Sequence, residues 1–488
     1  MNILMLSAEF APYSKTGGLG DAVPGLTQAL VAAGHEVRVV TPRYAGRYPD
    51  CEPVHQFQTP LPGYEVAVNI HCLDNLVLVQ ADAFETEHIY YGDNTDAHRF
   101  AVMCSAGLRY CQEVGFRPDI LHCNDWHSTL AIDYLHHLFS WDKLFDNTRT
   151  ALSIHNGGYQ GWCHENWQQL VVHPDLARDH INLLRYGIAC ADTVTTVSPT
   201  YAKELSQIFL ADLQGKKITG IVNGVDPTIW SPQLDVNLAT NYTTSDWTEG
   251  RQHNRQVLME AAGLKDKQQP LFGLVSRFTH QKGIDLLIAC LPHFLQTSNA
   301  AFIALGNGDA DLEENLLHIE QAYPDQVHFH RGYDETLAHR LMAGCDFLVM
   351  PSRFEPCGLT QLYAMGYGTI PIVRKTGGLN DTVRCESTQN GQGTGFVFEH
   401  FDESGLLWGL KQASQLFSQK SHLHEVIERC MGENFSWQRQ AAIYTEEYTR
   451  VNPSAVSKVS IPLTARQQPD AHTPEAEALD KLVQVSAA

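Results

Sequence analysis

Short apolar runs alternate with segments of helical periodicity along most of the chain. Between the runs of the first half lie helical patterns such as 129–139 and 200–209. The runs themselves are Asn2–Ser7, Glu36–Pro42, Asp119–Asp125, Ala151–Asn156, Asp192–Ser198 and Ile218–Asp226. Short apolar strands separated by helices indicate a parallel sheet that is covered on both faces. We therefore predict a doubly wound α/β domain in this half.

The alternation stops in a polar stretch between 230 and 268 and then resumes. The later runs are Pro270–Arg277, Ala300–Gly306, Val327–Gly332, Cys345–Ser352 and Thr369–Arg374. The pattern predicts two Rossmann-like domains that face a central cleft, at residues 1–246 and 247–435. Residues 436–451 are predicted to form a closing helix that returns to the first domain. Residues 452–488, rich in Pro, Ser, Gln and Ala, are predicted to be a disordered tail.

The charge and composition narrow the classes of partner. The chain has 34 basic and 55 acidic residues, a formal net charge of −21, which disfavours nucleic acid and anionic membranes as partners. A neutral polysaccharide meets no such repulsion. No C-x-x-C occurs among the 12 cysteines, so no metal site is predicted. No secretory signal and no run of about 18 apolar residues appears, so we expect a cytoplasmic protein.

Ligands of doubly wound sheets bind beyond the carboxyl ends of the strands, so functional residues are expected at these positions. After the first strand the chain reads KTGGLGD, in which Lys15, Gly17 and Gly18 suit a phosphate group at a helix N-terminus. A plain turn would also explain the glycines, and the dinucleotide fingerprint G-x-G-x-x-G is absent. The similar KTGGLND begins at Lys375, where we predict the same strand–glycine–helix geometry but a structural role.

In the second half, Arg277 and Lys282 follow a strand and suit a diphosphate, although a pair of solvated surface cations is the alternative. Glu355 could accept hydrogen bonds from sugar hydroxyls, and the helix beginning near Leu359 and Thr360 could bind phosphate oxygens.

Other polar residues follow strands of both halves. Asp125 and His155 end strands of the first half, where a structural role is the alternative. Tyr333 follows a strand of the second half and could stack on a base or pack at a rim.

These motifs together resemble the bacterial glycogen synthases and plant starch synthases, which are retaining glycosyltransferases of the GT-B fold. The resemblance covers roughly residues 1–450 and rests on KTGGLGD, HCNDWH, VSPTYAKEL, NGVDPTIWSP, SRFTHQKG and the segment PSRFEPCGLTQLYAMGYGTIPIVRKTGGLNDTV. It implies transfer of glucose from ADP-glucose to the non-reducing end of an α-1,4-glucan, with no cofactor. It leaves the oligomeric state undefined.

The resemblance also implies roles for residues at the matching positions. The implied catalytic residues are His155, Glu355, Lys15, Arg277, Lys282, Asp125 and Glu9. The implied donor-binding residues are Lys15, Gly17, Gly18, Asp21, Asn156, Asn223, Arg277, Lys282, Tyr333, Cys357, Gly358, Leu359 and Thr360. Tyr91 and Trp126 are implied on the acceptor side.

The implied mechanism is front-side departure, in which the cations of both domains stabilise the leaving diphosphate. Because both domains hold the diphosphate, we expect hinge closure over the donor. The alternatives are a UDP-glucose or small-acceptor enzyme of the same fold and an inactive glucan-binding protein.

The chain departs from the family pattern at a few places. Gly20 replaces a usual alanine, and Tyr363 stands where many retaining GT-B enzymes have a second glutamate, as glycogen synthases generally show. The segment between His155 and Asn223 is shorter than usual, and this departure concerns binding of the acceptor more than the donor chemistry.

Overall fold

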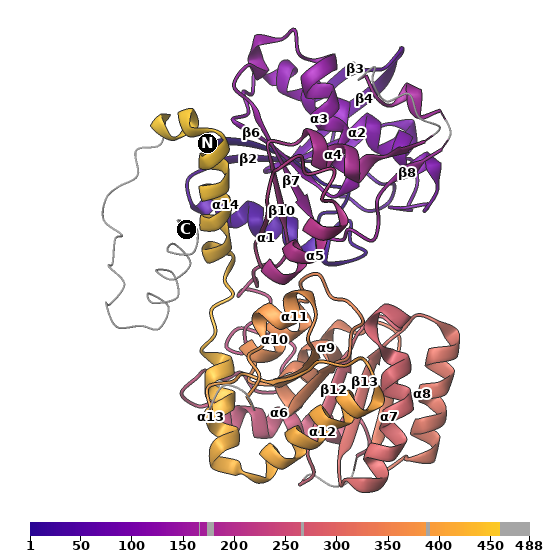
Figure 1. The fold of residues 1–488 in the computed structure, drawn as a ribbon, viewed down its shortest axis with the longest axis vertical. Helices are drawn as coiled ribbons and strands as arrows, with labels where there is room; N and C mark the ends of the chain where they lie inside the picture. The colour runs from indigo at the N-terminus through magenta and orange to yellow at the C-terminus, as the bar shows by residue number, and fades with distance from the viewer. Residues whose placement is uncertain (165, 173–179, 265–267, 387–390, 459–488) are drawn as a thin grey trace.

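The computed structural model describes residues 1–164, 166–172, 180–264, 268–386 and 391–458. It contains two α/β domains, one above the other in Figure 1, with a helix near the C-terminus returning to the upper domain. The predicted fold class is therefore confirmed. Within the described ranges, no helix is both long and apolar enough to cross a bilayer.

The N-terminal domain is built on a nine-stranded sheet of order β11-β10-β7-β6-β1-β2-β5-β4-β3. Every strand predicted for this half is present, and all strand pairs are parallel except β3–β4 and β4–β5, which are antiparallel. The strands are β1 (Asn2–Leu6), β2 (Glu36–Pro42), β3 (His55–Leu61), β4 (Tyr64–Leu73), β5 (Leu76–Gln80), β6 (Ile120–Asn124), β7 (Arg149–Ile154), β10 (Thr193–Thr196) and β11 (Ile218–Gly220). The prediction missed β3, β4 and β5, which extend one edge of the sheet.

The helices of this domain connect the strands. They are α1 (Gly18–Ala32), α2 (Asn94–Val114), α3 (Leu130–Asp133) with a π-helical turn at Tyr134–Leu138, α4 (Leu183–Cys190) and α5 (Pro199–Ile208). Proline at the first position and Ser198 as the N-cap, accepting from the Tyr201 N–H, fix the start of α5.

The C-terminal domain has an all-parallel six-stranded sheet of order β14-β13-β12-β15-β16-β17. Its strands are β12 (Leu271–Val275), β13 (Ala301–Gly306), β14 (Val327–Arg331), β15 (Phe347–Met350), β16 (Ile370–Arg374) and β17 (Phe396–Phe398). Its helices are α6 (Trp247–Ala261), α7 (Ile284–Thr297), α8 (Ala310–Ala322), α9 (Glu335–Gly344), α10 (Thr360–Gly366), α11 (Gly377–Thr382), α12 (Glu403–Ser418) and α13 (Lys420–Met431).

Helix α6 corrects the interpretation of 230–268 as a polar stretch without a strong pattern. Its buried side includes Trp247, Leu258 and the polar Arg251, whose guanidinium donates to the Tyr367 carbonyl and to Thr369 Oγ1. A helix that buries charged and polar residues has weak apolar periodicity, which is why the sequence pattern did not reveal it. The division of the chain at 246/247 stays a prediction.

The closing helix α14 (Trp437–Val451) packs against α1 of the N-terminal domain, as Figure 1 shows. A Cβ at Gly25 would lie 2.1 Å from the Trp437 indole nitrogen, so the absence of a side chain there permits the contact. Tyr448 OH lies 2.8 Å from His122 Nδ1 in the core. The chain stays ordered in a 3-10 turn at Pro453–Lys458, and the rest of the predicted tail, from 459, lies outside the described residues.

The second glycine heptapeptide lies between the two domains. Helix α11, which contains its glycines, contacts α5 of the N-terminal domain. Asp381 accepts from the Thr200 N–H and hydroxyl, both at 2.6 Å, and Ser198 Oγ donates to the Pro356 carbonyl at 2.6 Å. Lys375 forms an exposed ion pair with Glu399 at 2.6 Å. The heptapeptide therefore connects the domains, and its lysine points to a surface carboxylate.

Candidate active site

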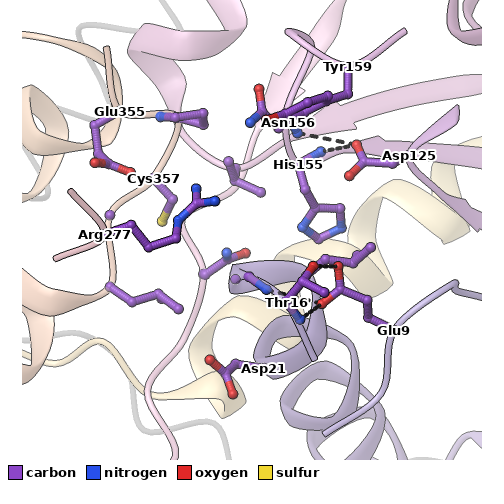
Figure 2. A pocket seen from close by; sticks show the side chains of 18 of the residues that line it. Glu9, Thr16, Asp21, Asp125, His155, Asn156, Tyr159, Arg277, Glu355 and Cys357 are labelled. Carbon is purple, nitrogen blue, oxygen red and sulfur yellow. Dashed lines mark hydrogen bonds between the residues drawn. The ribbon is translucent and has the colours of Figure 1, made fainter. Parts of the chain in front are cut away.

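A cavity of about 600 Å³ lies between the domains and is lined by loops from both (Figure 2). The lining residues follow β1, β6, β7, β10 and β11 in one domain and β12 and β15 in the other. Carboxyl ends of parallel strands thus face the cavity from both sides, which is the usual ligand position in doubly wound folds.

Glu9 organises the first glycine loop. Its buried carboxylate accepts from the Thr16 N–H at 2.6 Å, the Thr16 hydroxyl at 2.7 Å, the Gly17 N–H at 3.2 Å and the Tyr90 hydroxyl at 2.7 Å (Figure 2). The Gly17 N–H therefore points to Glu9. Among the described residues, the N–H groups of Gly18 and Leu19, at the start of α1, have no such partner. An anion in the cavity would meet these two amides and the N-terminus of α1.

Lys15 and Asp21 form an ion pair at 2.8 Å at the edge of the cavity. Burial raises the pKa of Asp21, and the Lys15 ammonium opposes that effect. In the other domain, burial raises the pKa of Tyr333. The Lys15 charge lowers that pKa and the Asp21 charge raises it, so the pair lies close enough to act across the cavity edge. A Cβ at Gly18 would lie 3.8 Å from Leu359, so the first glycine loop approaches the second domain closely.

Asp125 holds the loop after β7. Its Oδ1 accepts from the His155 N–H at 2.7 Å and the Asn156 N–H at 3.2 Å (Figure 2). Burial raises the pKa of Asp125 to about 7, although these N–H groups lower it. Its φ of 55° is a conformation that is costly for a residue with a side chain and typical of functional sites.

The His155 ring is neutral at pH 7, because burial lowers its pKa to about 4. Nε2 lies 3.0 Å from the Asn124 side-chain oxygen, so Nε2 carries the hydrogen. Nδ1 is then an acceptor, and it is buried without a protein partner. The ring therefore lines the cavity as an uncharged group, which suits a sugar.

The second domain contributes cations and a carboxylate. Lys282 Nζ lies 2.6 Å from Glu355 Oε2, which also accepts from Ser352 Oγ at 3.1 Å. Arg277 is exposed and lines the cavity, and among the described residues no carboxylate forms an ion pair with it. The wall of the cavity formed by the second domain therefore offers an unpaired guanidinium, on Arg277, beside Lys282, whose charge is balanced by Glu355.

Helix α10 begins at the same wall. Gly358, in a left-handed conformation with φ of 71°, precedes the Leu359 N-cap, which provides no side-chain cap. The amides at this end are available to an anion. Burial raises the pKa of the adjacent Cys357 to about 12, so its thiol stays neutral.

The second heptapeptide supports this loop from behind. Cβ atoms at Gly377 and Gly378 would lie 2.0 Å from the Glu355 carbonyl and 2.1 Å from the Cys357 carbonyl. The Gly378 N–H donates to the Glu355 carbonyl at 3.0 Å. The two heptapeptides thus differ in use: the first borders the cavity, and the second braces its wall.

Most residues that the sequence singled out come together here. The cavity lining includes Glu9, Gly17, Gly18, Asp21, Asp125, Trp126, His155, Asn156, Asn223, Arg277, Lys282, Glu355, Cys357, Gly358, Leu359 and Thr360. Three others are not among the lining residues. Lys15 pairs with the cavity-lining Asp21, Tyr333 is 77% exposed, and Tyr91 is half exposed with its ring packed on the buried Arg99 guanidinium.

The sequence did not point to several side chains that line the cavity on the N-terminal side. These are Thr16, Tyr90, Asp96 and Tyr159, whereas His127, which the sequence places after a strand beside Asp125, does line the cavity. Tyr90, rather than Tyr91, faces the cavity because its hydroxyl bonds to Glu9. Tyr363, noted only as a departure, also lines the cavity and stacks on Trp230 with ring centroids 4.0 Å apart.

The cavity is therefore chemically divided. One region collects a guanidinium, a lysine and free helix amides, which suit a diphosphate. Another collects neutral histidines, buried carboxylates and aromatic rings, which suit sugar rings and hydroxyls.

Two family models match the chain, one to each domain. Residues 2–223 match the model described as starch synthase catalytic domain, and residues 258–425 match the model described as glycosyl transferases group 1. A glycogen synthase of Myxococcus xanthus is 38% identical over 470 residues, which cover 90% of this chain and 96% of that protein. A glycogen synthase of Streptococcus gordonii is 36% identical over 479 residues, which cover 92% and 99%.

Solved structures agree with these matches. The catalytic domain of starch synthase IV from Arabidopsis thaliana, bound to ADP and acarbose, superposes with a TM-score of 0.83 at 30% identity, covering 92% of this chain and 99% of that one. A sucrose-phosphate synthase from Thermosynechococcus elongatus gives a TM-score of 0.62 at 18% identity over 93% of this chain and 99% of its own, a likeness of fold alone.

Proposed function

Since the chain belongs to the family of glycogen and starch synthases and is a glycosyltransferase, we propose that it transfers glucose from ADP-glucose to the non-reducing end of an α-1,4-glucan, with retention of configuration. The observation that carries the proposal is the convergence of diphosphate-binding groups from both domains on one cavity that also holds neutral, sugar-compatible groups. The starch synthase IV structure contains a nucleoside diphosphate and an oligosaccharide inhibitor, which is consistent with the same two kinds of ligand here.

The diphosphate of the donor would lie between the first glycine loop and the second domain. Arg277 and Lys282 would bind it from one side, and the N–H groups at the starts of α1 and α10 would bind it end-on. Lys15, now paired with Asp21, would add a charge from the edge. As the C1–O bond breaks, negative charge grows on the leaving diphosphate, and these groups stabilise it more in the transition state than in the ground state.

The transferred glucose would lie against Glu355, Cys357 and His155. Glu355 would accept hydrogen bonds from hydroxyls, and the neutral His155 ring would border the sugar without adding a charge. Asp125 would hold the loop after β7 in place, because its carboxylate accepts hydrogen bonds from the backbone N–H groups of His155 and Asn156. The acceptor chain would enter past Trp126, His127 and Tyr159, and its terminal hydroxyl would attack from the face that the diphosphate leaves.

The direct test is release of nucleoside diphosphate by the purified protein with glycogen as acceptor. ADP release from ADP-glucose is expected, together with incorporation of labelled glucose into the polymer. Faster turnover with UDP-glucose than with ADP-glucose would show that UDP-glucose is the donor instead. Transfer to a small sugar in preference to glycogen would replace the acceptor assignment, and no turnover with either donor would favour a glucan-binding protein.

We also propose that the domains close on the donor, because its diphosphate would be held from both. The α5–α11 contact, with Asp381 bonded to Thr200, is suited to act as the pivot. Small-angle scattering should give a smaller radius of gyration with ADP than without it. An unchanged radius would contradict closure.

A further inference from the structure

A short two-stranded ribbon carries exposed aromatic rings beside the cavity. It consists of β8 (Trp162–Cys163) and β9 (Ile181–Asn182), which pair antiparallel. Side chains alternate along such strands, and here Cys163 and Ile181 are buried. The opposite face carries Trp162, His164 and His180, which are all exposed.

The three rings lie close together on that face. The Trp162 and His164 rings are nearly parallel, with an interplanar angle of 8° and centroids 6.2 Å apart. The His180 ring lies 5.2 Å from Trp162 and 5.4 Å from His164. The Trp162 side chain nevertheless stays 47% exposed, so part of its indole ring is open to a ligand. A tryptophan left exposed beside other rings commonly marks a binding surface.

The ribbon is continuous with the proposed acceptor side of the cavity. Gly161, directly before Trp162, packs so closely that a Cβ there would lie 2.3 Å from the ring of Trp126, a cavity-lining residue. Tyr159, which also lines the cavity, is 64% exposed and comes from the same segment (Figure 2). The His164 N–H donates to Asn94 Oδ1 at 3.4 Å, and Asn94 lies between the cavity-lining Gly92 and Asp96.

We propose that this ribbon is an outer glucan subsite, which binds glucose units of the acceptor chain that extend beyond the cavity. The inference rests on the proposed function. Trp162 would stack on the apolar face of a glucose ring, and the imidazoles of His164 and His180 would bond to its hydroxyls. A neutral chain of repeating sugars fits both the aromatic surface and the net charge of −21, which disfavours a polyanionic occupant.

The subsite predicts a dependence on acceptor length. In Trp162→Ala, KM for maltoheptaose should rise about 3- to 10-fold, the range for loss of one aromatic contact, while KM for maltotriose and kcat with saturating acceptor stay unchanged. Trp162→Phe keeps a ring and should restore most of the affinity. Trp141→Ala is the matched control, because Trp141 is 74% exposed in the same domain but is not a cavity residue. Equal changes for both acceptors, or no change for maltoheptaose, would overturn the subsite.

A binding experiment without donor separates this inference from the proposed function. In native gels that contain glycogen, the wild-type protein and Trp141→Ala should be retarded more than Trp162→Ala, with melting temperatures showing that each variant is folded. Equal retardation of Trp162→Ala, alongside normal transfer activity, would overturn the subsite alone. Retardation that depends on Trp162, without transfer from any nucleotide sugar, would support the subsite and contradict the proposed function.

Discussion

The Lys282 ammonium lies 2.6 Å from the Glu355 carboxylate, and both side chains line the cavity. The pair is shielded, because the side chains are only 20% and 8% exposed. A diphosphate that enters beside it would share Lys282 with Glu355. As a result, the carboxylate can remain near the donor without repelling the phosphates strongly.

Lys282 and Glu355 are therefore expected to act as one unit. Lys282→Ala should lower kcat/KM by about 10²- to 10³-fold, because it removes a charge that stabilises the leaving group. Glu355→Gln should also lower kcat, and the double variant should be little worse than the poorer single variant. Steady-state kinetics with ADP-glucose measure all three. Strictly multiplicative losses would show that the two side chains act independently.

The two glycine heptapeptides provide a matched pair of lysines. Lys15→Ala should lower kcat/KM by about 10²- to 10³-fold, since its ammonium lies beside the first glycine loop. Lys375→Ala should leave kcat/KM unchanged, because its partner is the exposed Glu399 on the outer surface. Parallel kinetic measurements test both. Comparable losses of kcat/KM in the two variants would contradict a catalytic role for the first heptapeptide lysine and a purely structural role for the second heptapeptide.

The bracing role of the second heptapeptide predicts a steric effect. In Gly378→Ala the new Cβ would meet the Cys357 carbonyl at 2.1 Å, so the Glu355–Thr360 loop must shift. We expect a fall in kcat of at least about tenfold, since small misplacements of reacting groups are costly. Gly366→Ala is the control, because no atom lies within 4 Å of its Cβ position. Normal turnover in Gly378→Ala would show that the wall does not depend on the brace.

The strands of both sheet centres could be predicted because parallel strands buried on two faces form continuous apolar runs. The edge strands β3, β4 and β5 were missed. Along β3 exposed residues alternate with partly buried ones, as at His55–Gln58, and this edge pairs antiparallel. The weakly apolar α6 was missed for a related reason, since Arg251 and Asn254 occupy buried positions on it. Sequence patterns reveal burial only where burial is apolar.

The strand-end rule found the motif residues of the site but not their partners. Nothing local distinguishes Tyr90 from Tyr91, because the deciding contact is made with Glu9, 81 positions away. Likewise, the resemblance implies that Glu9 lies near the reacting centre, but it does not reveal that the Glu9 carboxylate also accepts from the Thr16 and Gly17 N–H groups. Such contacts depend on the tertiary fold, which a single sequence does not encode in any local pattern.

The buried carboxyl of Asp125 predicts a specific dependence of stability on pH. Its pKa is about 7 in the folded protein and 3.8 as an ordinary carboxyl, so between these values the folded state binds a proton that the unfolded state lacks. Stability from this group is thus fully present below pH 4 and is lost as the pH rises through 7, by about 1.4 kcal/mol per pH unit.

Asp125→Asn keeps an oxygen acceptor but does not titrate. The difference in unfolding free energy, wild type minus Asp125→Asn, should therefore fall between pH 5 and pH 8 by a few kcal/mol. Asp74→Asn controls for the backbone, because Asp74 also has a positive φ, of 50°, but is exposed. Denaturant unfolding at a series of pH values measures both variants, and a difference for Asp125→Asn that stays constant with pH would contradict a proton held on this carboxyl.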